Sequence, residues 1–164
     1  MVDLSLTGIV LIVFLANTIY GLASPFLPPL LAAQGINTSW TGLIFASYAI
    51  GVTVSAPLVG SLIEKLGHKK IMATGVILMA ACCGVLSLAK YLEGSDGAII
   101  GAGIALRFFQ GCASAMINTC SYSYAALAYT DNVDKVIALL ESTSGIGCVC
   151  GPVIGSFVYD LVGF

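Results

Sequence analysis

Long apolar runs alternate with short polar segments along the whole chain. Each run is near or above the roughly 20 residues that an α-helix needs to cross the hydrocarbon core of a membrane. The pattern therefore predicts an all-α membrane protein with five transmembrane helices and no soluble domain. These helices are expected at about residues 6–33, 40–63, 71–89, 98–128 and 136–162.

Local signals refine the first two predicted helices. Pro25, Pro28 and Pro29 crowd the far end of the first run. Because proline removes a backbone hydrogen bond and kinks a membrane helix, we expect a kink there. The second helix is expected to begin with Ser39 as its N-cap, since serine side chains satisfy free backbone N–H groups at a helix start.

Composition narrows the class of protein. The chain is 59% hydrophobic and 9% charged, whereas a soluble domain carries about 25% charged residues. The partner of this surface is expected to be a lipid bilayer, and no basic patch indicates nucleic acid. The six cysteines lie inside apolar runs without metal-ligand spacing, so we expect no metal and no cofactor. His68 is the only histidine, and no catalytic grouping is possible around it, so an enzyme is not expected.

A short charged segment, residues 60–70, separates the second and third predicted helices. It holds one acid, three lysines and one histidine between apolar runs. Cytoplasmic loops of membrane proteins collect lysine and arginine. The segment is therefore expected to form a tight cytoplasmic hairpin, which also puts the N-terminus in the cytoplasm. Whether the membrane is vesicular or the plasma membrane stays open.

Two charged residues fall inside predicted helices. Arg107 lies about 15 Å into the fourth helix at 1.5 Å per residue, near the middle of the membrane. A charge at that depth is costly and is by default functional, although an arginine that only links helices is an alternative. Our depth estimate places Glu141 within about 5 Å of the same height. We expect the two to pair or to share a water-filled cavity and to serve proton coupling, unless Glu141 reaches the cytoplasmic interface instead.

Glycines mark the fifth predicted helix. Gly147, Gly151 and Gly155 recur every four residues and share one face, and Pro152 adds a kink. Small residues four apart let membrane helices approach closely. The stripe is therefore predicted to be a helix-packing surface, and we expect it to lack its partner within this chain.

Three segments together resemble the major facilitator superfamily of secondary transporters. Residues 60–70 resemble the loop between its second and third helices, residues 107–115 its fourth-helix signature, and residues 147–155 the fifth-helix motif of its antiporters. The first helix and the end of the chain look most like the vesicular amine and polyamine transporters. The resemblance implies that Arg107 takes part in proton coupling. It also implies a cytoplasmic gate that uses Gly60, Glu64, Lys65, Gly67, Lys69 and Lys70, with His68 in the basic tail.

One departure from that family concerns the first helix. Vesicular monoamine transporters carry an aspartate just before the asparagine that matches Asn17, and here that position is Ala16. The resemblance therefore favours a polyamine-like branch, or an uncharacterised relative, over the monoamine transporters. Asn17 and Gln110 are expected to line a substrate cavity.

Taken with the resemblance, these features predict proton-coupled antiport of a small organic cation by alternating access. Facilitators have two six-helix halves with the substrate bound between them, and five spans resemble most of one N-terminal half. We expect the remaining half, or a partner chain, to complete the transporter. The alternative is a truncated membrane protein that does not transport and acts as a structural or regulatory partner of a full-length transporter. Such a chain would self-associate through the glycine stripe.

Overall fold

The computed structural model describes residues 6–22, 24–25, 27–33, 35–88 and 96–162, and the described chain is helical without strands. Five candidate spans cover residues 6–29, 39–66, 68–85, 99–128 and 130–157. This confirms the all-α prediction with five transmembrane helices. Large apolar side chains face outward, as lipid contact requires, and Val149 is 70% exposed. The elements are α1 (Leu6–Leu22), α2 (Leu27–Ala33), α3 (Thr38–Leu66), α4 (His68–Leu88), α5 (Asp96–Ala128), the 3-10 helix η2 (Thr130–Asn132) and α6 (Val133–Val162).

The first span is divided into α1 and α2. A turn at Ser24 and Pro25 separates the two helices, and the Ser24 N–H donates to the Gly21 carbonyl at 3.0 Å. Pro28 and Pro29 fall in the first turn of α2. Backbone N–H groups there have no partner within the helix, so proline costs little at these positions. The first span is therefore not one kinked helix, as we predicted, but two separate helices.

The start of α3 differs from the prediction in its capping residue. Asn37 is the N-cap, and its side-chain oxygen accepts a hydrogen bond from the Ser39 N–H at 3.1 Å. The expected cap, Ser39, lies inside the helix. The reason is the preceding turn: Gly35 has a φ of 74°, which glycine adopts at no steric cost, and the helix then begins at Thr38, two residues earlier than we predicted.

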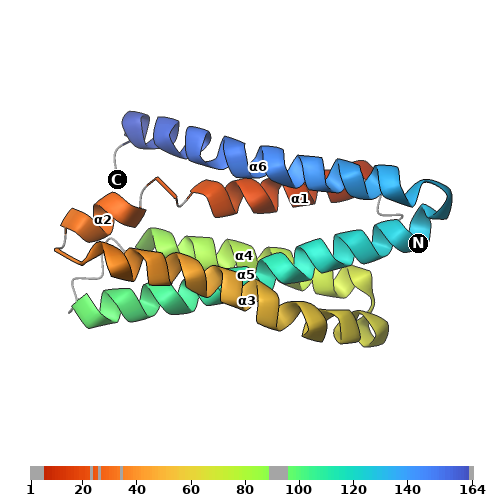
Figure 1. Cartoon of the computed structure of the whole chain (residues 1–164), viewed down its shortest axis with the longest axis horizontal. Coiled ribbons are helices and arrows are strands. Elements are labelled where there is room, and N and C mark those ends of the chain that lie inside the picture. The colour runs from red at the N-terminus through yellow and green to blue at the C-terminus, as the bar shows by residue number, and fades with distance from the viewer. Residues whose placement is uncertain (1–5, 23, 26, 34, 89–95, 163–164) are drawn as a thin grey trace.

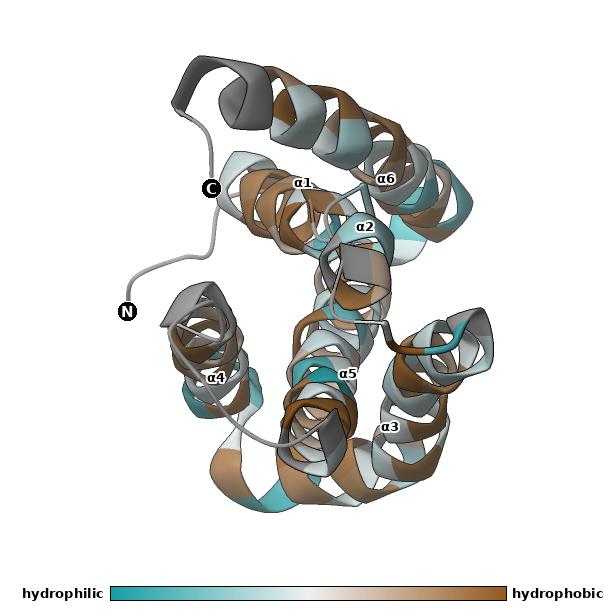
Figure 2. Cartoon of the chain, turned by 90° about the vertical axis from the view of Figure 1, so that its left-hand side faces the viewer, coloured by the Kyte–Doolittle hydropathy of each residue, from teal (hydrophilic) through white to brown (hydrophobic). Residues whose placement is uncertain are grey.

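Two groups of helices make up the bundle (Figure 1). Viewed along the helices, α5 lies between α3 and α4, while α1 and α6 lie together on one side of α5 (Figure 2). The α3–α4 hairpin and η2 lie at the same end of the bundle. The central position of α5 is what places Arg107 among several helices.

Glycines bring α3 and α5 into backbone contact. A Cβ on Gly51 would overlap the Phe108 carbonyl, and one on Gly111 would overlap the Tyr48 carbonyl. Only hydrogen atoms fit at these two crossing positions, which is how small residues let membrane helices approach. The close crossing fixes the height of Tyr48 relative to Arg107.

The glycine stripe on α6 packs against α1. A Cβ on Gly147 would lie 2.7 Å from the Phe14 carbonyl oxygen, and one on Gly151 would lie 2.7 Å from the Gly21 Cα. Gly155 on the same face is also buried. The expectation that this stripe lacks its partner within the chain is therefore wrong, because α1 covers it.

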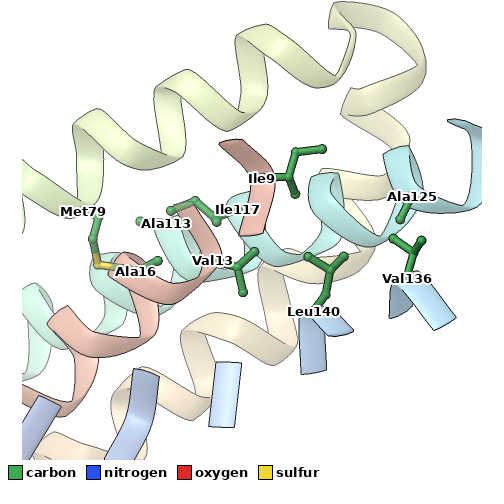
Figure 3. Close-up of a cluster of buried hydrophobic side chains, with 9 residues drawn as sticks. All are labelled: Ile9, Val13, Ala16, Met79, Ala113, Ile117, Ala125, Val136 and Leu140. Carbon is green, nitrogen blue, oxygen red and sulfur yellow. The ribbon is translucent and has the colours of Figure 1, made fainter. Parts of the chain in front are cut away.

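A core of apolar side chains joins the two groups of helices. Figure 3 shows these side chains meeting from α1, α4, α5 and α6. Leu140 and Val13 are fully buried, so the α1–α6 pair rests on α5 through side chains rather than through glycine contacts. The core consists of Ile9, Val13, Ala16, Met79, Ala113, Ile117, Ala125, Val136 and Leu140.

Candidate functional site

Arg107 on α5 is fully buried, with 0% of its surface exposed. Aromatic rings from two other helices contact its guanidinium group. The central carbon of that group lies 5.0 Å from the ring centre of Phe45 on α3 and 5.8 Å from that of Tyr20 on α1. Aromatic faces stabilise a cation within about 6 Å. The sequence prediction of a buried, costly charge inside the bundle is thus matched by the position of Arg107.

One edge of the guanidinium is bonded and the other is not. Nη1 of Arg107 donates to the Gln110 Oε1 at 3.0 Å. Nε and Nη2 are buried and have no hydrogen-bond partner among the described residues. A buried donor without an acceptor costs about 1–3 kcal/mol, and more when it is charged. The site therefore retains unused hydrogen-bonding capacity at a positive centre.

Side chains from four helices surround the arginine. Gln110 extends this hydrogen-bond network to α4, because its Nε2 donates to the sulfur of Cys83 on that helix at 3.2 Å. The rings of Tyr20 and Tyr48 stack with centroids 4.2 Å apart and an interplanar angle of 26°. Tyr48 lies beside Ser114, the next polar position along α5. The arrangement is an aromatic and polar enclosure around one charge.

Asn17 lies one turn before Tyr20 on α1 and is 7% exposed. Its Nδ2 donates to the Val13 carbonyl at 2.8 Å, and its Oδ1 lies 3.9 Å from the Cys148 sulfur on α6. Asn17, Gln110 and Arg107 thus all point into the protein and none faces lipid. That they line one substrate cavity remains a prediction.

Glu141 does not pair with Arg107. Its side chain is exposed on α6 and lies beside the Tyr122 hydroxyl. Tyr122 is about 22 Å further along α5 than Arg107 at 1.5 Å per residue. The predicted pairing and equal depth are wrong because α5, with 33 residues, is much longer than the membrane core, and its C-terminal end reaches well past the arginine.

The α3–α4 hairpin lies within the predicted segment 60–70 and turns at Gly67. This glycine has a φ of 80° and its N–H donates to the Ile63 carbonyl at 2.9 Å. Glu64, Lys65 and Lys70 are exposed, and so is Lys69. Among the described residues, nothing lies within 4 Å of a Cβ placed on Gly60, so this glycine makes no close helix contact with this part of the chain.

Comparisons with known proteins identify the family. The sequence profile of the Major Facilitator Superfamily matches residues 9–164. The chain belongs to the Major Facilitator Superfamily. Its five spans resemble most of the N-terminal six-helix half of a superfamily transporter, and it is a multi-pass membrane protein.

Several superfamily relatives are similar at modest identity. The chain is 30% identical over 129 residues to the chloramphenicol resistance protein CraA of Acinetobacter baumannii, and this alignment covers 78% of the chain and 29% of that protein. It is 28% identical over 147 residues to the MFS-type transporter SLC18B1 of Homo sapiens, and this alignment covers 88% of the chain and 32% of that protein. It is 30% identical over 127 residues to the vesicular acetylcholine transporter of Drosophila melanogaster, and this alignment covers 76% of the chain and 21% of that protein. The chain thus spans about a third or less of the length of these relatives.

The enclosure around Arg107 was not predicted from the sequence of this superfamily chain. Tyr20, Phe45 and Cys83 were not singled out, although Tyr20 follows Asn17 by one helical turn and shares its face. His68 was also placed only in a basic tail. It is half-buried, its Nε2 is 3.0 Å from the Ser123 Oγ, and its ring meets Tyr124 edge-on at 6.0 Å. His68 therefore links the start of α4 to the C-terminal part of α5.

Proposed function

We propose that this chain is the N-terminal part of a transporter that moves a small organic solute by proton-coupled antiport with alternating access. The observation that carries the proposal is the fully buried Arg107 with two unused donors. An ionisable residue inside a membrane protein marks a substrate or proton pathway. Superfamily transporters bind the solute at the midplane between two halves, and Arg107 would face that site from this half.

The solute class in this proposal is an organic cation of the amine or polyamine type. The rings of Tyr20, Phe45 and Tyr48 offer the faces that organic cations favour, and one similar protein is a vesicular acetylcholine transporter. Another similar protein is a chloramphenicol resistance protein, so the relatives differ in their solutes. Asn17 and Gln110 would supply hydrogen bonds that orient the solute.

Proton coupling would involve Arg107 and Glu141 at two separate positions. Glu141 lies in the third turn of α6, which begins directly after η2, and its neighbour Tyr122 offers a hydroxyl. A proton carrier at this position would exchange protons with the cytoplasm. In this proposal the N-terminus is cytoplasmic, and Gly60, Glu64, Lys65, Gly67, Lys69 and Lys70 form the gate on that side.

The test uses a full-length transporter that carries this segment, reconstituted in liposomes. Glu141→Gln removes the titratable group with little change in shape. We expect it to abolish solute uptake driven by a pH gradient while solute exchange without a gradient continues. The matched control is Asp131→Asn, which removes an exposed acid in η2 and should leave both activities intact.

The two assays separate coupling from binding. If gradient-driven uptake persists in Glu141→Gln, then Glu141 is not the proton carrier. If neither gradient-driven uptake nor exchange of any amine, polyamine or neutral organic solute is found in the unmodified transporter, the transport proposal itself fails.

A further inference from the structure

The free edge of Arg107 has the geometry of a carboxylate-binding site. In a guanidinium group, the N–H bonds of Nε and Nη2 point the same way and form a planar fork. A carboxylate matches that fork with two parallel hydrogen bonds. Here these two atoms have no partner among the described residues, while the opposite side is bonded through Nη1 to Gln110.

Among the described residues, no neighbouring group places a hydrogen-bond acceptor on this fork. Phe45 and Tyr20 lie against the guanidinium group, 5.0 and 5.8 Å from its central carbon, and ring faces offer no hydrogen-bond acceptor comparable to a carboxylate. Gln110 is held between Nη1 of Arg107 and the Cys83 sulfur. The Gln110 side chain therefore orients the guanidinium group of Arg107 but makes no hydrogen bond with its Nε–Nη2 edge.

Nothing in the described chain supplies the matching negative charge. Glu141, the acid predicted to do so, lies beside Tyr122 instead. The other acids with described side chains, Glu64, Asp131 and Asp134, belong to the hairpin and the η2–α6 segment. A positive charge enclosed among apolar groups needs a counter-ion to be tolerated.

We propose that the Nε–Nη2 edge of Arg107 binds a carboxylate group that comes from outside this segment. The carboxylate is borne either by the transported solute or by an acidic side chain of the remaining transporter. The role of this site in transport rests on the proposed function, whereas the binding chemistry does not. If an acidic side chain occupies the edge, it also neutralises Arg107, and an organic cation can then approach the same aromatic faces without repulsion.

The chain offers a direct probe, because Arg107 is its only arginine. Labelling arginine with ¹⁵N in the 164-residue chain, held in lipid nanodiscs, gives one side-chain Nε signal. We expect acetate, and benzoate as a bulkier carboxylate, to shift this signal saturably. Equal concentrations of chloride or propylammonium should not shift it. Binding of ¹³C-labelled acetate should be lost in Arg107→Gln and weakened at least tenfold in Arg107→Lys, which keeps the charge but not the fork.

The same signal in a full-length transporter that carries this segment identifies the source of the carboxylate. If the solute supplies it, acetate still shifts the signal and competes with the solute. If an acidic side chain supplies it, the signal is already at the carboxylate-bound position and acetate has no effect. The proposal is overturned if acetate leaves the signal of the 164-residue chain unchanged, or if chloride shifts it equally. Neither result depends on transport, so a failure here is distinct from a failure of the antiport proposal.

Discussion

The crossing of α3 and α5 should not tolerate a single added methyl group. In Gly111→Ala the new Cβ would overlap the Tyr48 carbonyl and lie 3.0 Å from the Val52 nitrogen. Both neighbours are backbone atoms, so no side-chain rotation relieves the overlap. To restore ordinary contacts of about 3.5 Å, the two helices must separate by roughly 1 Å.

The expected net cost is about 1–2 kcal/mol. Overpacking in a well-packed core costs about 1–3 kcal/mol, and the gain in helix propensity of alanine over glycine, about 1 kcal/mol at most, offsets part of it. The overpacking cost should exceed the propensity gain, because separating the helices also loosens their contacts at neighbouring turns. The matched control is Gly101→Ala on the same helix, where no described atom lies within 4 Å of the added Cβ, so only the propensity gain remains.

Native cysteines provide the measurement. Cys82 and Cys120 are buried, so a thiol-reactive fluorophore reports unfolding of the chain in detergent as temperature rises. Gly111→Ala should lower the midpoint temperature and Gly101→Ala should not. The double variant Gly51→Ala with Gly111→Ala should cost less than the sum of the single variants, because one separation of the helices accommodates both methyl groups. Equal midpoints for Gly111→Ala and Gly101→Ala would refute this account of the crossing.

Two further predictions use the same thermal assay. Gly151→Ala should destabilise the chain by about 1–3 kcal/mol, because its Cβ would lie 2.7 Å from the Gly21 Cα, whereas Gly145→Ala on the same helix meets no described atom within 4 Å; equal effects would argue against α1–α6 backbone contact. His68→Ala should cost about 0.5–1.5 kcal/mol, the value of the lost hydrogen bond to Ser123, and an unchanged midpoint would mean that this link contributes nothing to stability.

Sequence patterns predicted the spans well because their physical cause is local. Each membrane helix must satisfy its own backbone hydrogen bonds and present apolar side chains to lipid, so an apolar run of sufficient length identifies it. Prolines and glycines acted locally too: Pro28 and Pro29 mark the interruption of the first span, and Gly67 marks the hairpin turn. These residues carry their conformational preference wherever they stand.

The surroundings of charged residues could not be predicted in the same way. The depths of Arg107 and Glu141 were counted from the starts of two antiparallel helices, which were expected on opposite sides of the membrane. A hydrophobic run does not reveal how far a helix continues past the membrane core. The aromatic partners Tyr20 and Phe45 come from other helices. Packing decides which faces of α1 and α3 turn toward α5. Glycines such as Gly111 indicate a close helix contact, but they do not reveal which helix is the partner.

The pairing of α1 with α6 has a consequence for synthesis of the protein. The first helix made has its closest backbone contacts with the last of the five spans. Some 110 residues separate α1 from α6, which corresponds to roughly 6–22 s of translation at 5–20 residues per second. During that time the α1 face that later receives Gly147 and Gly151 has no α6 to cover it and must be shielded by lipid or by the insertion machinery. Biogenesis should therefore be most vulnerable before α6 enters the membrane, and a ribosome stalled ahead of α6 should leave α1 accessible to cross-linking.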